Sequence, residues 1–443
     1  MSTTTTDTPD APTPDAPAVT ETDEVVLRTT ESRESRTHRM SMGALLLVIG
    51  VLMGYLVTQT SGSAQFALSN AFDEVQLPTF TLPGVPVVLL SALVLLVAGG
   101  LMVALRLPGS WPAVLGTLAG LATVVGFLTW AAAGRGLPFQ LSNQMAGTIM
   151  LATPLIFGAL CGIMCERAGI VNVAIEGQML TAAFTAAVVG SLTKSITFAI
   201  IGAVIAGVLM AAMLALFTIK YLVDHVVLGV VINLFASGLT GFLFDQLVRP
   251  NSGQFNAAPT MKAMPIPVLS ELPFIGPVLF SQTILVYLAG IAVALAWFVL
   301  FKTSWGLRIR SVGEHPQAAD TVGINVYGIQ WSAVLFGGVF AGLGGAFFTV
   351  GSIGAFSKDI TVGNGFIALA AVIMGRWHPI FAAVIALFFG FVTQMATQLQ
   401  TLSTPMPSQF LLMLPYVATI IAVAGLVGRV RGPAHDGKAY VKA

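Results

Sequence analysis

Charged residues are scarce in this chain. Asp, Glu, Lys and Arg together make up 9% of its 443 residues, whereas soluble globular chains carry roughly 25%. Hydrophobic residues reach 56%, so the chain has too few polar side chains to cover a surface in water. The formal net charge of +1 leaves no basic face for DNA or RNA, which excludes nucleic acid as a partner. A lipid bilayer is the expected medium.

Cysteine is nearly absent as well. Cys161 and Cys165 are the only two, and they lie one turn apart in a single apolar run, where helix geometry disfavours a disulfide. A metal site would need further ligands, and only Glu166 is close in sequence. We interpret both thiols as core residues and expect no metal and no cofactor. The histidines are scattered, which gives no nucleophile and base pair to argue from: His38, His225, His315, His378 and His435.

A phosphate-binding loop is also missing. The only Gly-Lys pair, at 437–438, precedes Ala439 instead of Ser or Thr. The glycine-rich stretch 337–345 resembles a nucleotide loop only superficially, because it lies in an apolar run and the spacing of Gly338 and Gly342 suits close helix packing. We therefore expect no catalytic residues in this chain, which is not an enzyme, and expect ATP hydrolysis only in a partner.

Long apolar runs dominate what is present. A bilayer core of about 30 Å takes roughly 20 apolar residues per helix. The sequence therefore predicts an all-α, polytopic transmembrane helical bundle of about 12 spans (10 to 12), with short or broken helices near the midplane. The run 363–376 is too short to cross alone, and we expect irregular backbone to complete that crossing. The predicted spans are 43–59, 85–105, 113–133, 146–165, 172–192, 196–219, 225–247, 282–301, 330–350, 363–376, 379–399 and 408–428.

The two ends of the chain are predicted to lie in the cytoplasm. Residues 1–40 are rich in Thr, Pro, Ala and acidic residues and should form a disordered tail. Residues 41–430 form the transmembrane domain, and 431–443 a C-terminal tail. The first apolar run begins near Gly43, too late for a signal peptide. This orientation follows the positive-inside rule, because only five Lys and Arg residues of 20 fall outside: Arg135, Lys194, Arg249, Lys262 and Lys358.

Two connections exceed ordinary loop length. The external one, 248–281, contains several prolines and suits a stiff lid or docking surface. Within the internal one, 302–328, the stretch 313–324 predicts a short helix on the membrane face, since Pro316 suits its first turn and Gly323 its end. Such a helix is either a docking element or an ordinary amphipathic connector.

Polar residues interrupt two apolar regions. Asn, Glu and Gln occur between 169 and 180, and a second interruption covers 359–366. Paired glycine-interrupted segments in two halves of a chain indicate a midplane translocation site, and an ionisable residue within a span is by default a functional one. Alternatively, Glu176 caps the next helix near the cytoplasmic interface, and Asn233 joins helices. The candidate pathway residues are Asn172, Glu176, Gln178, Asn233, Asn364 and Phe366.

The motifs at 166–178, 318–324 and 363–379 look like those of the nucleoside and simple-sugar permeases of the branched-chain-type ABC importer family, a resemblance that covers about residues 146–430. Gln317-Ala318-Ala319 with Gly323 resembles the EAA-x3-G pattern of ABC import permeases, with glutamine in place of glutamate. The implied coupling helix, which seats in an ATPase, comprises Glu314, Pro316, Gln317, Ala318, Ala319, Asp320 and Gly323.

The resemblance implies a multi-pass permease subunit in the plasma membrane. Its expected partners are a second, different permease chain, a tandem-domain ABC ATPase and an extracellular substrate-binding lipoprotein. Purine nucleosides are the favoured substrates, and simple sugars are the alternative. An ion-coupled secondary transporter is the competing class, for which Glu176 would be the convincing ion-binding carboxylate.

Overall fold

The computed structural model describes residues 33–70, 75–106, 108–402, 407–421 and 431–442. Most of the predicted N-terminal tail (1–32) and the end of the last predicted span (422–428) lie outside the described residues. Among the described residues, ten helices are long and apolar enough to cross a membrane, and α13 (Asn364–Met374) and α15 (Ser408–Ile421) are shorter apolar helices. The predicted polytopic helical bundle with short helices is confirmed.

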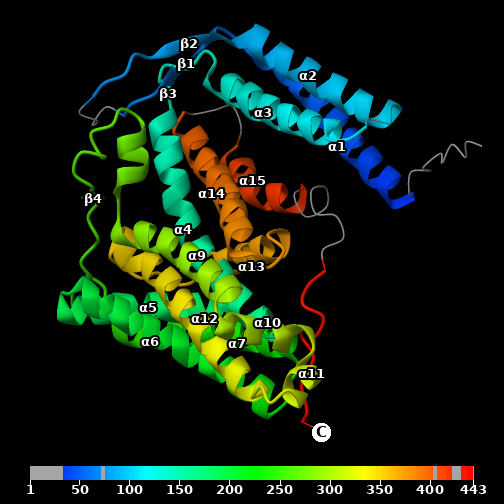
Figure 1. The fold of residues 1–443 in the computed structure, drawn as a ribbon. Helices are drawn as coiled ribbons and strands as arrows, with labels where there is room; N and C mark the ends of the chain where they lie inside the picture. The colour runs from blue at the N-terminus through cyan, green and yellow to red at the C-terminus, as the bar shows by residue number, and fades with distance from the viewer. Residues whose placement is uncertain (1–32, 71–74, 107, 403–406, 422–430, 443) are drawn as a thin grey trace, which may run out of the picture.

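The first three helices form a separate layer, which we call the arm: α1 (Arg33–Gln59), α2 (Gly84–Ala104) and α3 (Trp111–Ala132). Figure 1 shows it lying across one end of the molecule, above α14 and α15. Its helices pack through their own apolar cluster, which includes Leu46, Leu95 and Met102. α1 begins earlier than the expected start near Gly43, because the polar residues before it are compatible with a helix.

A small sheet connects the arm to the remaining helices. Strand β1 (Ser63–Ala67) pairs antiparallel with β2 (Phe80–Pro83) and parallel with β3 (Phe139–Gln140), in the order β2-β1-β3. A second apolar cluster beneath it joins residues of the sheet and α3 to Leu402.

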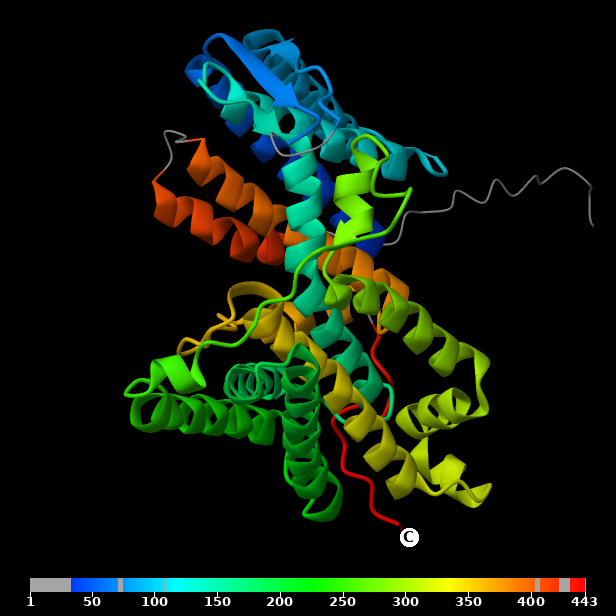
Figure 2. The ribbon, with the colours of Figure 1, turned by 90° about the vertical axis from the view of Figure 1, so that its left-hand side faces the viewer.

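The remaining helices, which we call the body, surround α4 (Leu141–Glu166), which runs through the centre of the molecule in Figure 2. Against it pack α12 (Val326–Phe348), α13 and α14, and α5 (Ile175–Thr193) and α6 (Ile196–Ala215) pack in turn on α12. The backbones of α6 and α12 nearly touch: a Cβ added to Gly207 would lie 2.5 Å from the carbonyl oxygen of Gly338. The packing interpretation of the glycine-rich stretch is confirmed.

The body also contains three further long helices, α7, α9 and α14, and several short elements. The external connection holds only short elements, in line with the expectation that its prolines oppose a long helix. In chain order, these further elements of the body are η1 (Leu216–Lys220), α7 (His225–Leu243), η2 (Phe244–Val248), α8 (Ser252–Phe255), β4 (Met264–Pro265), η3 (Gly276–Phe280), β5 (Ser281–Gln282), α9 (Ile284–Lys302), η4 (Thr349–Ile353) and α14 (Pro379–Thr401).

The internal connection forms two helices, α10 (Ser304–Glu314) and α11 (Pro316–Thr321). The prediction of a single helix over 313–324 was therefore wrong in its bounds. The Thr303 hydroxyl accepts a hydrogen bond from the Gly306 amide and starts α10. The break falls at His315, which precedes a proline and is therefore kept out of the helical region. Gly323, with φ of +83°, ends the turn after α11 as expected.

The C-terminal segment, residues 431–442, lies along α10 and α11 instead of projecting away (Figure 1). The amide of His435 donates to the Gly313 carbonyl at 2.9 Å, and the amide of Gly437 donates to the Gly169 carbonyl at 3.2 Å. Tyr440 is buried in an apolar cluster with Ala319 of α11. Residues 431–442 therefore pack against the predicted coupling helix and support it.

Candidate functional site

The chain breaks between α4 and α5. α4 ends at Glu166, and Gly169, with φ of +87°, turns the chain back alongside it. α5 starts at Ile175, whose side chain would lie 3.3 Å and 3.2 Å from a Cβ placed on Gly158 and Gly162. At 1.5 Å per residue, Gly158 is roughly 12 Å from the end of α4. α5 thus begins within the depth spanned by α4.

The short helix α13 starts beside α4 at the same depth as α5. Its residue Ala368 lies against Gly158, and its Val372 lies against Gly162, at 2.7 Å and 2.9 Å from the added Cβ positions. Gly363 has φ of +76° and turns the chain into the helix. Both interrupted segments therefore meet beside the middle of α4.

The carboxylate of Glu176 joins the two segments. One oxygen accepts hydrogen bonds from the Thr361 hydroxyl at 2.5 Å and the Gly363 amide at 2.9 Å, and the other accepts from the Gly365 amide at 2.6 Å. Glu176 thereby caps α13, where the helix dipole favours a negative charge. The Gly365 position excludes a side chain, because a Cβ there would lie 2.5 Å from the Glu176 backbone nitrogen. Glu176 also lies in the first turn of α5, the position required by the alternative in which it caps the next helix.

Asn233 holds the same region from α7. Its side-chain oxygen accepts from the Gly177 amide at 2.8 Å, and its side-chain nitrogen donates to the Val173 carbonyl at 2.9 Å. The Ser237 hydroxyl, one turn further along α7, donates to Asp359 at 2.8 Å. α7 therefore binds both interrupted segments, and Asn233 makes the helix-joining contacts that were its alternative interpretation.

Asn172 and Gln178 lie behind Glu176, on the side of α4. Both are completely buried, and the Asn172 amide nitrogen donates to the Gln178 oxygen at 3.2 Å. The Cys161 thiol donates to the same oxygen at 3.2 Å. Both cysteines are buried and free, which confirms the packing interpretation. These groups fix the shape of the irregular segment.

The remaining two candidates lie on α13. The Asn364 side chain donates to the Thr361 carbonyl at 2.7 Å, next to the groups that bind Glu176. The Phe366 ring is 49% exposed. The structure thus gathers Glu176, Asn233 and Asn364 around one helix start and leaves an aromatic ring exposed beside it.

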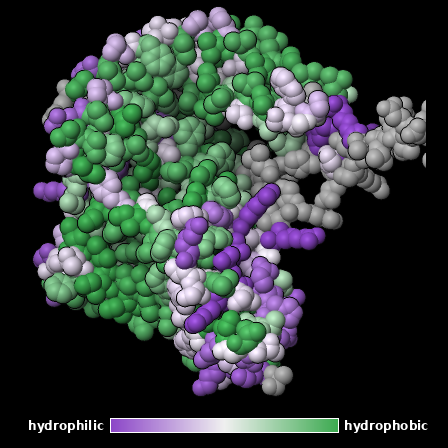
Figure 3. Space-filling view, viewed as in Figure 1, coloured by the Kyte–Doolittle hydropathy of each residue, from purple (hydrophilic) through white to green (hydrophobic). Residues whose placement is uncertain are grey.

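The predicted coupling residues divide into two sets. Pro316 and Ala319 are buried against the body, whereas Glu314, Gln317, Ala318 and Gly323 are exposed and Asp320 is half-buried. Figure 3 shows hydrophilic residues gathered over α10, α11 and the C-terminal segment, in contrast to the hydrophobic surface over most of the molecule. One face of α11 is therefore anchored and the other is free for a partner.

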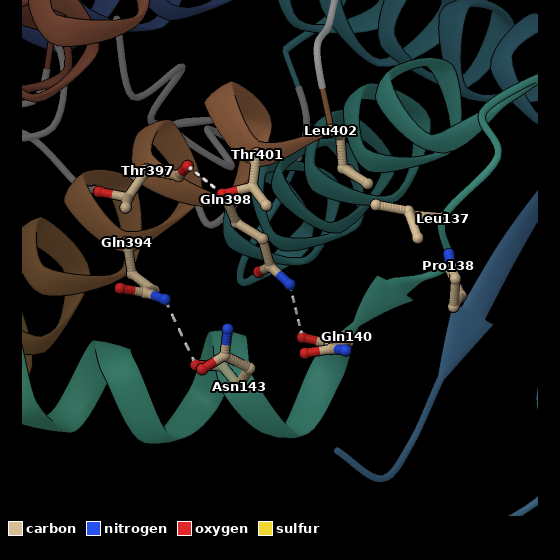
Figure 4. Close-up of a pocket in the computed structure, with 9 residues that line it drawn as sticks. All are labelled: Leu137, Pro138, Gln140, Asn143, Gln394, Thr397, Gln398, Thr401 and Leu402. Atoms are coloured by element: carbon tan, nitrogen blue, oxygen red, sulfur yellow. Dashed lines mark hydrogen bonds between the residues drawn. The ribbon is translucent and has the colours of Figure 1, made fainter. Parts of the chain in front are cut away.

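A polar cavity that the sequence reasoning missed lies between the ends of α4 and α14 opposite α11 (Figure 4). The signal was present as polar residues three and four apart in an apolar run, a spacing that places them on one helix face. It was overlooked because none of these residues is ionisable. The polar lining residues are Gln140, Asn143, Gln394, Thr397, Gln398 and Thr401.

Comparison with known proteins gives a consistent set of matches. Residues 144–428 match the family described as "Branched-chain amino acid transport system / permease component". The nucleoside ABC transporter permease protein NupC of Lactococcus lactis is 43% identical over 308 residues, which are 67% of this chain and 96% of that protein. The guanosine ABC transporter permease protein NupQ of Bacillus subtilis is 39% identical over 311 residues, 68% of this chain and 97% of that protein.

A third relative carries a sugar name. The putative glucose ABC transporter permease protein TsgC13 of Haloferax volcanii is 32% identical over 266 residues, 59% of this chain and 79% of that protein. No solved structure matches this chain significantly.

Proposed function

Because this chain belongs to the family of branched-chain amino acid transport system permease components, we propose that it is a permease subunit of an ABC importer for nucleosides, purine nucleosides above all. The observation that carries the proposal is the extent of the likeness. The family match takes in both interrupted segments and α11, and the two relatives named for nucleosides or guanosine match over nearly their whole length. The relative named for glucose is less similar.

The solute passes beside the start of α13. Glu176, Asn233 and Asn364 supply polar groups there, and the exposed ring of Phe366 offers a face on which a nucleobase can stack. Asn172 and Gln178 act in the pathway by holding its wall, because both are fully buried. Glu176 accepts hydrogen bonds from Thr361, Gly363 and Gly365 at the start of α13, which argues against an ion-coupled secondary transporter that needs this carboxylate free for an ion.

Energy reaches the pathway through α11. The exposed Gln317 and Ala318 face a separate tandem-domain ATPase, and the small alanine side chain lets the partner backbone approach closely. In this proposal α11 and both chain ends lie in the cytoplasm, and the helices span the plasma membrane. A second permease chain completes the pathway, and a lipoprotein delivers the solute from outside.

Uptake of radiolabelled guanosine and adenosine tests the proposal in a strain that lacks this chain. The wild-type gene should restore uptake, and unlabelled nucleosides, but not glucose or ribose, should compete. Restored uptake of sugars alone would overturn the choice of substrate.

The coupling step is checked in the same strain. Ala318→Arg places a bulky charge on the exposed face of α11 and should abolish both uptake and co-purification of the ATPase. The control is Arg308→Ala at an exposed position of α10, which removes a charge without adding bulk. Full ATPase binding by Ala318→Arg contradicts docking at α11.

A further inference from the structure

The cavity between α4 and α14 has the features of a binding site. Its volume is about 140 Å³, and six of its nine lining residues carry an amide or a hydroxyl group, whereas none carries a charge. The remaining three are Leu137, Pro138 and Leu402. It lies at the end of α4 that begins at Leu141, far from Glu166, where α4 approaches the coupling region. The cavity therefore lies at the end of the molecule opposite α11, next to the arm.

Glutamine side chains bridge the two helices with their nitrogen atoms only. The Gln398 nitrogen donates to the Gln140 carbonyl at 2.9 Å, and the Gln394 nitrogen donates to the Asn143 carbonyl at 3.5 Å. One turn deeper, the Gln144 nitrogen donates to the Phe391 carbonyl at 3.0 Å. These bonds hold the amides in place across the helix pair, so their carbonyl oxygens have fixed directions.

The oxygen of Gln398 is left without a donor. Gln398 is 7% exposed, and its Oε1 atom is buried and accepts no hydrogen bond. Figure 4 shows the amide turned so that its nitrogen faces Gln140 and its oxygen faces the space between Gln394 and Asn143. A buried acceptor without a partner costs about 1–3 kcal/mol, and native proteins rarely leave one unsatisfied. The cavity therefore calls for a molecule that donates a hydrogen bond.

We propose that this cavity is an outer subsite that binds the nucleobase of the transported solute, through a base N–H donated to the Gln398 oxygen. Amide side chains match the adjacent donor and acceptor atoms of a base edge. The size fits the six-membered ring of a base, because a cavity of about 150 Å³ holds benzene. The uncharged lining suits a nucleoside better than a phosphate ester. The inference rests on the proposed function and adds to it a second place of contact, remote from Glu176.

Cysteine protection measures occupancy of the cavity directly. Both native cysteines are completely buried, so Thr397→Cys supplies a single reactive thiol on the exposed part of the lining. The importer is assembled with its partner subunits in nanodiscs, and the rate of modification by a thiosulfonate reagent is followed with and without adenosine. Adenosine should slow modification about fivefold or more, and ribose should not. The control is Gln400→Cys, which is exposed on the same helix but does not line the cavity, and its rate should not respond.

Gln398→Met then removes the acceptor at nearly constant volume, together with the nitrogen that donates to the Gln140 carbonyl. In the Thr397→Cys background it should raise the adenosine concentration for half-protection about tenfold, the effect of losing one buried hydrogen bond. Modification that adenosine never slows, a thiol that never reacts, or equal protection by ribose overturns the subsite. If Gln398→Met fails to fold, protection of Thr397→Cys alone decides.

The two proposals fail separately. Guanosine and adenosine uptake by the wild-type importer, measured in parallel, tests the proposed function. Uptake without protection at Thr397→Cys removes only the outer subsite and leaves the nucleoside importer in place.

Discussion

The arm and the body meet the membrane in different ways. In the arm, 22%, 39% and 28% of the spanning parts of α1, α2 and α3 are buried within the protein, whereas the values for α4, α5 and α12 at the centre of the body are 83%, 67% and 72%. The outer body helices α6, α7, α9 and α14 resemble the arm, at 28% to 39%. Glycine allows close approach in both parts, at Gly43 and Gly99 in the arm and at Gly207 and Gly338 in the body. In a bilayer, where apolar side chains gain little by leaving lipid, close backbone packing is what holds helices together.

The candidate functional residues lie in the body and not in the arm. The arm lies outside the family match at 144–428, and it attaches to the body through the small sheet and through Trp130, which packs with Leu399 and Leu411. Glu176, Asn233 and α11 all belong to the body. The difference teaches that the buried central helices and the polar contacts between interrupted segments mark the transporting part of the chain, while the arm is an added apolar layer.

The largest expected effect tests the packing difference. Gly342→Leu should destabilise the protein by about 3 kcal/mol or abolish its folding, because even a Cβ at Gly342 would lie 2.5 Å from the Val204 Cα atom. Gly120→Leu in α3 should change little, since nothing lies within 4 Å of its Cβ position. Thermal unfolding of both purified variants in detergent measures the effect. Equal losses of stability in the two variants would contradict this difference in packing between the body and the arm.

The next effect concerns polar contacts. Glu176→Ala removes three hydrogen bonds to a carboxylate, each of a class worth about 1.5–3 kcal/mol, and should lower nucleoside uptake about tenfold or more without disturbing assembly. Glu176→Gln keeps one acceptor oxygen and should be intermediate.

Thr123→Ala is the matched change in the arm, because the Thr123 hydroxyl contacts only its own helix, at the Ala119 carbonyl. Its uptake should equal that of the wild type. Normal uptake by Glu176→Ala would return this carboxylate to a purely structural role.

The smallest effect is the response of the C-terminal segment to pH. Burial raises the pKa of Asp436 from its ordinary value of 3.8 to about 7. The folded state therefore binds a proton that the released segment gives up, so attachment is strongest below pH 3.8 and weakens as the pH rises towards 7. Hydrogen exchange at His435 and Gly437, corrected for intrinsic rates, should show several-fold less protection at pH 8 than at pH 5.5.

Asp436→Asn should remove this difference. The carboxyl group of Glu166 faces Asp436, and burial lowers the pKa of His435, which keeps that ring neutral over most of the interval. The arm supplies the contrast, because its core cluster is entirely apolar and its exchange should be independent of pH. Protection that does not change in the wild type contradicts a buried Asp436.

Sequence periodicity was sufficient for the long helices, because a bilayer imposes their length and composition. It was insufficient where contacts between distant segments decide the structure. The capping of α13 by Glu176 joins positions 185 residues apart or more, and nothing local to either segment reveals it. α10 was missed because its start depends on the Thr303 cap. The polar cavity is formed by two helices that are distant in sequence. The spacing of Gln394 and Gln398 is therefore visible in the sequence, but the cavity that they line is not.

The C-terminal segment makes the shape of α11 depend on a distant part of the chain. Tyr440 shares an apolar cluster with Ala319 of α11, and the His435 amide donates to the Gly313 carbonyl. α11 has only six residues, and so short a helix is marginal in water without tertiary contacts. A substitution at Tyr440 therefore alters α11 without touching its exposed face.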